Sequence, residues 1–132
     1  MEIIASRAIS ALEYAPHMTA IYKILRRQEW LTAQDAGTFT GSEVDRRDGY
    51  IHFSTAAQAR ETARRHFAGQ ADLVVLEIEG DALGPALVWE PSRGGDLFPH
   101  LYGALDTTHV RTIYEAPLGP GGLPMLVFLE RP

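Results

Sequence analysis

The stretch YIHFSTAAQARETARRHFA, residues 50–68, decides the fold, because a strand pattern in it runs directly into a helix pattern. Alternating aromatic, apolar and polar residues from Tyr50 to Ser54 predict a strand. Thr55 and Gln58 have the spacing of a capping box and predict a helix from 56 to about 68, with Thr55 as its N-cap. An apolar stripe on that helix predicts the face that packs on a sheet; its members are Ala56, Ala59, Ala63 and Phe67.

The rest of the chain extends this unit in both directions. The patterns predict strands over residues 21–25, 73–78, 87–89, 110–114 and 125–129, a helix over 28–36 that ends at Gly37, and loops over 38–49, 91–99 and 117–124. This order predicts an α+β fold with a mixed, strongly bent β-sheet and two main short helices.

Residues 18–132 are predicted to form a single α+β domain. Residues 1–17 differ from the rest and are interpreted as an N-terminal arm, appended or mis-started, because Met18 stands just before the first strand. A genuine helix over residues 5–14 is the alternative.

Composition restricts the classes of function. The chain has 132 residues and no cysteine, which excludes disulfides, thiolate metal sites and a thiol nucleophile and fits a cytoplasmic location. Its formal net charge of -5 makes nucleic acid an unexpected partner, because nucleic-acid binding needs basic surface. The sequence contains no apolar run of about 20 residues, the length needed to cross a membrane.

The first candidate cluster lies on the predicted strand over residues 50–54. Tyr50, His52 and Ser54 share one face because alternate residues of a strand point the same way. The N-terminus of the next helix offers N–H groups that suit an anion such as phosphate. The competing interpretation is that Ser54 and Thr55 only cap the helix and that His52 makes a local hydrogen bond. We favour the capping role for Thr55 and a functional role for His52.

The second candidate cluster is WEPSRGGDLFPHLYG, residues 89–103, interpreted as a Gly- and Pro-rich loop that carries function. It holds Glu90, His100 and Tyr102, and Pro99 stiffens the approach to His100. The alternative is a packed loop whose apolar side chains fill the core. We expect His52 and His100 to line one concave site, with Ser54 and Tyr102 nearby.

Two other site types receive less support. The histidine spacing matches no local metal-ligand pattern, so we expect no metal site. A Ser54–His–acid nucleophile lacks the strained Gly-x-Ser-x-Gly turn.

The chain resembles a bacterial family catalogued as domain of unknown function 952. The resemblance rests on IYKI (21–24), Trp30, DGYIHFST (48–55), the pair Thr62 and Ala63, WE (89–90) and FPHLYG (98–103), and it covers about residues 21–116. Many relatives carry His where this chain has Lys23, which alters the acid–base chemistry of that position.

This family is distantly similar to ADP-ribosyltransferase-like folds, which arrange an early His or Arg, a Ser/Thr motif and a late acid around NAD. The resemblance implies that Lys23, His52, Ser54 and Thr55 occupy comparable places, with Glu90 as the nearest late acid. It makes NAD a candidate cofactor.

These observations lead to one prediction with stated alternatives. We predict a polar pocket that binds a small-molecule ligand, namely a nucleotide such as NAD. We predict that the protein acts on this ligand as a transferase. The alternatives are a non-catalytic metabolite-binding module and a protein-interaction module. The predicted catalytic residues are His52, His100 and Glu90, and the predicted ligand-binding residues are Lys23, Tyr50, Ser54, Thr55 and Tyr102.

Overall fold

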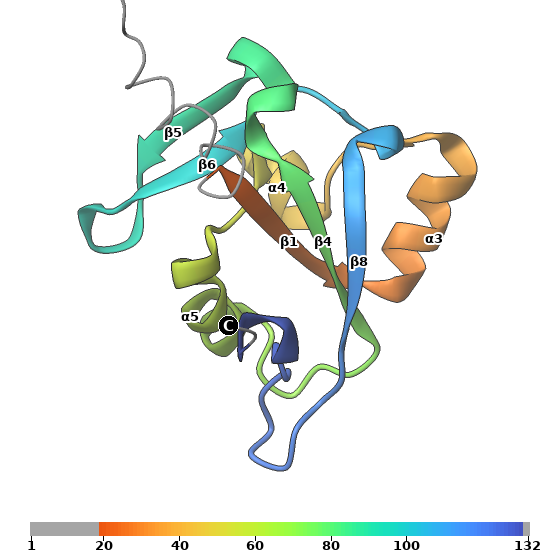
Figure 1. The fold of residues 1–132 in the computed structure, drawn as a ribbon, viewed down its shortest axis with the longest axis vertical. Helices are drawn as coiled ribbons and strands as arrows, with labels where there is room; N and C mark the ends of the chain where they lie inside the picture. Colours follow the sequence, from red (N-terminus) through yellow and green to blue (C-terminus); the bar gives the residue numbers. More distant parts are fainter. Residues whose placement is uncertain (1–18, 131–132) are drawn as a thin grey trace, which may run out of the picture.

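A computed structural model of the chain describes residues 19–130. Its centre is a three-stranded antiparallel sheet in the order β1-β4-β8, formed by Ala20–Arg26, Leu73–Glu79 and Val110–Ala116 (Figure 1). β4 is mostly apolar and is buried along its first four residues, as expected for a strand with a neighbour on each side and packing on both faces.

Two smaller sheets complete the β-structure. β5 (Leu87–Pro91) and β6 (Leu97–Leu101) form a hairpin, and β3 (Ile51–His52) pairs with β6 to give the order β3-β6-β5. β2 (Thr38–Phe39) pairs with β7 (Leu105–Asp106). An isolated bridge between Tyr22 and Ser54 joins β1 to the segment that follows β3.

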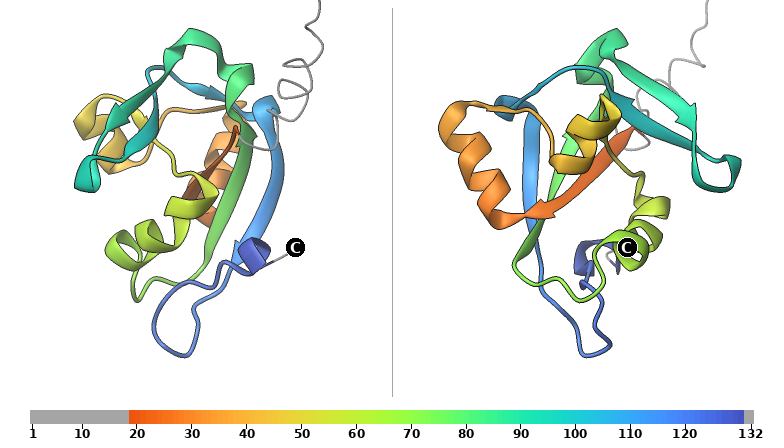
Figure 2. Two further views of the ribbon diagram at one scale, coloured as in Figure 1. Left: turned by 60° about the vertical axis from the view of Figure 1, so that its left-hand side comes forward. Right: turned by 180° about the vertical axis from the view of Figure 1, so that it is seen from behind.

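The described chain also has three α-helices and four short 3-10 segments, which lie between the strands or after the last one. The helices are α3 (Arg27–Ala36), α4 (Glu43–Asp48) and α5 (Ala56–His66), and the 3-10 segments are Gly80–Ala86, Arg93–Gly95, Thr107–His109 and Val127–Glu130. The 3-10 segment Gly80–Ala86 links β4 to β5, and Figure 2 shows it at the opposite end of the molecule from the 117–124 loop. No helix within residues 19–130 has the length and hydrophobicity needed to span a membrane.

Hydrophobic clusters cover both faces of the central sheet. Val74 and Leu76 belong to the cluster that contains Trp30 of α3, whereas Val75 belongs to the cluster that contains Ala63 of α5. Alternation along a strand explains this division, because successive side chains point to opposite faces. Both predicted helices therefore pack an apolar face against the same sheet, although Ala56, at the start of the stripe predicted for α5, is exposed and Phe67 is only partly buried.

The sequence correctly predicts how α5 begins. Thr55 Oγ1 accepts a hydrogen bond from the Gln58 N–H at 3.2 Å, and Gln58 Oε1 accepts one from the Thr55 N–H at 3.0 Å. This is the reciprocal pattern of a capping box. Gly37 also ends α3 as predicted, with φ 83° in the left-handed region.

The α+β class is confirmed, but several details of the predicted fold are wrong. Every strand pairing in residues 19–130 is antiparallel and divided among three sheets, so the sheet is not mixed. α4 occupies part of the predicted loop 38–49, because Ser42 and Asp45 form a capping box and Gly49 ends the helix after six residues, too few to show a periodic pattern. The predicted strand 125–129 is instead a 3-10 turn, in which the Leu129 N–H donates to the Leu126 carbonyl.

The predicted N-terminal arm, residues 1–17, lies outside the described residues.

Candidate functional site

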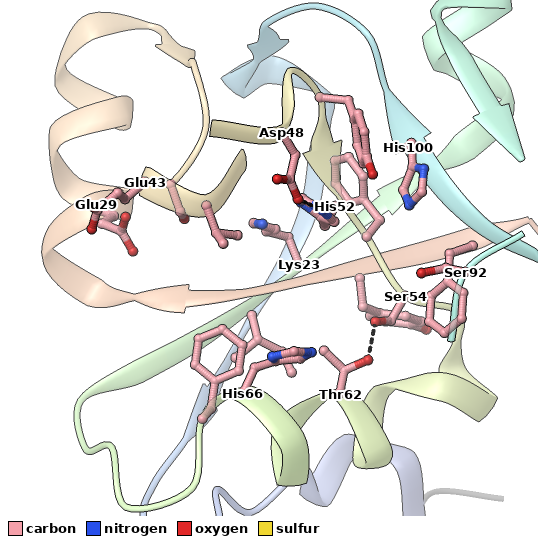
Figure 3. Close-up of a pocket in the computed structure, with 18 of the residues that line it drawn as sticks. Lys23, Glu29, Glu43, Asp48, His52, Ser54, Thr62, His66, Ser92 and His100 are labelled. Carbon is pink, nitrogen blue, oxygen red and sulfur yellow. Dashed lines mark hydrogen bonds and ion pairs between the residues drawn. The ribbon is translucent and has the colours of Figure 1, made fainter. Parts of the chain in front are cut away.

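A cleft of about 720 Å³ runs alongside β1, with α4 and β3 on one side and α5 on the other (Figure 3). Lys23 contributes from β1, His52 from β3, His100 from β6, and Thr62 and His66 from α5. The Tyr22–Ser54 bridge brings these elements together, because it holds the segment after β3 against the edge of β1.

The buried carboxylate of Asp45 organises one wall of this cleft. Asp45 Oδ1 lies 2.6 Å from His52 Nδ1, and Oδ2 lies 2.8 Å from Lys23 Nζ. The Ser42 N–H also donates to Oδ2 at 2.9 Å, and the His52 N–H donates to Oδ1 at 3.2 Å. One carboxylate therefore sets the positions of the lysine, the imidazole and the start of α4.

The two partners of this ion pair have lowered pKa values for different reasons. Burial raises the pKa of Asp45, but the His52 hydrogen bond, the charge and hydrogen bond of Lys23 and the Ser42 N–H outweigh it and bring the pKa to about 2. Burial lowers the pKa of Lys23, and the attraction of Asp45 opposes this effect only in part. Lys23 thus makes a buried ion pair within the wall of the cleft.

His52 also contacts a second carboxylate. Its Nε2 lies 3.0 Å from Asp48 Oδ2, at the end of α4. Arg47 Nε donates to the same carboxyl group at 3.2 Å. The Arg47 hydrogen bond is the largest cause of the lowered pKa of Asp48, with a smaller contribution from His52. Asp48 is therefore an acidic group in the cleft lining beside the imidazole.

His100 has its own carboxylate. His100 Nδ1 lies 2.7 Å from Glu90 Oε1, and the Tyr102 hydroxyl donates to both Glu90 oxygens, at 2.9 and 3.1 Å. These bonds lower the pKa of Glu90, with His100 as the first cause, and the bond to Glu90 raises the pKa of Tyr102. Glu90 and Tyr102 lie behind the ring, and neither lines the cleft.

The prediction that His100 lies in a loop is wrong. His100 lies in β6 directly opposite His52 of β3, and Pro99 does not prevent this pairing because its carbonyl accepts from the Phe53 N–H. Side chains of directly opposed residues in an antiparallel pair lie on the same face. The ring centroids of the two histidines are accordingly 5.4 Å apart.

Tyr50 fills the space between these groups. Its ring stacks on His100 at a centroid distance of 4.1 Å and lies 4.7 Å from His52 and 5.2 Å from Tyr102. Burial raises the pKa of Tyr50, and the charges of Asp48 and Glu90 raise it further. Tyr50 thus keeps its proton at neutral pH and lines the cleft as a hydrogen-bonding phenol.

The other end of the cleft carries hydroxyl groups. Ser54 Oγ lies 2.9 Å from Thr62 Oγ1 of α5, and His66 lies one turn further along the helix (Figure 3). The hydroxyl of Ser54 is bonded to a threonine rather than to a histidine, so the geometry of a serine nucleophile is not formed. Thr55 is occupied by the capping box and lies outside the cleft lining.

Four residues of this site were missed by the sequence analysis: Asp45, Asp48, Thr62 and His66. The Ser42–Asp45 spacing was an available signal for α4, and a lysine within an apolar strand pattern implies a buried acid elsewhere. Among residues 19–130, no group of three or more His, Cys, Asp or Glu side chains is arranged to hold a metal ion.

Comparisons with known proteins place the chain near one solved protein. It is similar to the X-ray structure of protein CC0527 from Caulobacter crescentus, with 48% identity and a TM-score of 0.83 over 86% of this chain and 100% of that chain. The solution NMR structure of CC0527 is 50% identical, with a TM-score of 0.75 over 82% of this chain and 93% of that chain. A comparison with curated proteins gave no match. The sequence profile described as "Protein of unknown function (DUF952)" matches residues 24–113.

Proposed function

This chain belongs to the DUF952 family, and we propose that it is an enzyme that binds a nucleotide-sized ligand beside β1 and acts on it by acid–base chemistry at His100, with His52 holding Asp48 beside it. NAD is the first candidate ligand.

One observation carries the proposal: two of the imidazoles that line the cleft, those of His52 and His100, each have a carboxylate on Nδ1. The distances are 2.6 Å from His52 to Asp45 and 2.7 Å from His100 to Glu90. A carboxylate in this position orients the ring and stabilises the imidazolium formed when the ring accepts a proton. A histidine that only fills space does not need a carboxylate on its Nδ1.

The size of the cleft supports a small-molecule ligand rather than a protein surface. Its volume of about 720 Å³ falls in the range of roughly 300–1,000 Å³ that is usual for ligand sites. Of the apolar residues of β6 that could form an interaction patch, Phe98 and Leu101 are buried and Leu97 is exposed. The protein-interaction alternative therefore receives less support than the ligand-binding alternatives.

With NAD, the proposed reaction is transfer at the ribose carbon that bears nicotinamide. The carbon–nitrogen bond breaks and its electron pair leaves with neutral nicotinamide, while positive charge develops on the ribose. Asp48 is the cleft-lining carboxylate beside the histidines and is proposed to stabilise that charge. An acceptor hydroxyl forms the new carbon–oxygen bond and gives its proton to His100. Glu90, which lies behind His100, is proposed to position the ring.

The test combines binding and turnover. A thermal-shift screen with NAD, ADP-ribose, AMP and adenosine should show a rise in Tm for at least one ligand, because a ligand that binds only the folded state stabilises it. Release of nicotinamide from NAD, followed by NMR, then tests the transfer.

The variants His52→Gln and His100→Gln should abolish nicotinamide release. The matched control is His109→Gln, which changes a histidine outside the cleft lining. Binding without turnover in the wild-type protein would favour the non-catalytic metabolite-binding module. A screen with no shift for any ligand would contradict the proposal.

A further inference from the structure

We infer that His100, rather than His52, offers the ligand a free ring nitrogen, that this nitrogen is an unprotonated Nε2, and that the group it binds is a hydroxyl, amine or amide N–H rather than a phosphate. The inference rests on the proposed function, because it names the class of chemical group bound at the same site.

The hydrogen bond between His100 and Glu90 decides the tautomer. An ionised carboxylate can only accept hydrogen bonds, and Glu90 already accepts from the Tyr102 hydroxyl. His100 Nδ1, at 2.7 Å, must therefore be the donor. A neutral imidazole carries one N–H, so Nε2 of neutral His100 holds a lone pair and accepts hydrogen bonds.

This Nε2 is open to the cleft. Among the described residues it has no hydrogen-bond partner, and the single buried side-chain nitrogen or oxygen without a partner is His109 Nδ1. An unpartnered His100 Nε2 must therefore reach solvent, even though the residue as a whole is only 4% exposed. Figure 3 shows the His100 ring on the wall of the cleft.

Both ring nitrogens of His52, in contrast, already face carboxylates. Nδ1 lies 2.6 Å from Asp45, and Nε2 lies 3.0 Å from Asp48. A ligand would have to displace Asp48 to reach this ring. His100 is therefore the histidine placed to receive a proton from a ligand.

The charges around the cleft argue against a phosphate at this position. Each lysine or arginine in the described cleft lining is paired with a carboxylate: Lys23 with Asp45, Arg26 with Glu29, and Arg47 with Asp48. Glu90 adds a further negative charge behind His100. Among the described side chains, a phosphate beside His100 Nε2 would meet carboxylates and no unpaired cation, whereas a neutral or cationic donor would be attracted.

The first arm of the test measures the tautomer without any ligand. Long-range ¹H–¹⁵N NMR spectra of the ¹⁵N-labelled full chain above pH 7.5 distinguish the two neutral forms of each histidine. Through-bond correlations assign His100, so the assignment does not depend on a variant that folds. We expect the Nδ1–H form of His100 to predominate, and predominance of the Nε2–H form would overturn the inference.

Glu90→Gln is the matched variant, because glutamine keeps the shape and can also donate. It should reduce the Nδ1–H fraction of His100 at least about twofold, since the preference for Nδ1 as donor is lost. An unchanged fraction would show that Glu90 does not set the tautomer and would contradict the inference.

The second arm uses inorganic phosphate as the probe. Phosphate at about 10 mM, matched for ionic strength with chloride, should leave the His100 ring signals unchanged. This concentration is far above the Kd expected of a specific phosphate-binding site, so such a site would be saturated. Saturable shifts of these signals would overturn the inference. If the ligand screen fails while the tautomer is Nδ1–H and phosphate has no effect, the proposed function fails and the assignment of His100 stands.

Discussion

Replacing Asp45 by Asn tests the buried network most directly. Asp45 is 1% exposed, and its carboxylate is the partner of Lys23, whose side chain is 7% exposed. The change from a pKa of 3.8 to about 2 on folding corresponds to about 2 kcal/mol of stability at neutral pH. Asn cannot neutralise the lysine, and leaving one member of a buried pair uncompensated costs about 3–5 kcal/mol. We expect Asp45→Asn to lose about 3 kcal/mol.

Urea unfolding followed by circular dichroism measures this loss. Asp35→Asn is the matched control, because Asp35 is exposed on α3 and the change should be within about 0.5 kcal/mol. In the double variant Lys23→Met/Asp45→Asn both charges are removed, so the combined loss should be smaller than the sum of the single losses by about 2 kcal/mol. Additive losses, or an Asp45→Asn loss no larger than the control, would refute the ion-pair account.

Three further predictions concern pH, the helix cap and a glycine. Because the pKa of Asp45 is lowered on folding, its contribution to the free energy of unfolding is complete above the unfolded pKa of 3.8 and is lost as pH falls toward about 2. Urea unfolding at a series of pH values should therefore show that the difference in stability between the wild type and Asp45→Asn shrinks across that range. Thr55→Ala should cost about 1 kcal/mol in the same assay while Thr55→Ser restores most of it, and equal stabilities would reject the capping role. Gly41→Ala should cost about 2 kcal/mol, because Gly41 has φ +110° and an added Cβ would lie 2.8 Å from the Asp45 Cβ. Gly121→Ala, in open space, should change stability by less than about 1 kcal/mol, and a loss equal to that of Gly41→Ala would contradict the steric argument.

Local signals were sufficient to predict much of the fold. The Thr55–Gln58 spacing located the start of α5, and the apolar run that begins at Leu73 identified the central strand. These features depend on residues close together in the chain, where capping bonds and alternation act. The shared face of His52 and Ser54 follows from the same alternation, and both residues line the cleft.

Long-range pairing decided what the sequence could not. The opposition of His52 and His100 depends on the β3–β6 register, which joins segments 48 positions apart, and the loop prediction for His100 was wrong because a Gly- and Pro-rich hairpin resembles a loop. The Ser42–Asp45 spacing signals only the start of α4; Asp45 is important to the site because folding brings it against Lys23 and His52. The sequence by itself determined the α+β class, the N-cap of α5, the end of α3 and which residue types were available for chemistry. Only the tertiary structure decided which carboxylate serves which histidine, because hydrogen bonds between side chains depend on distances that strand pairing and helix packing set.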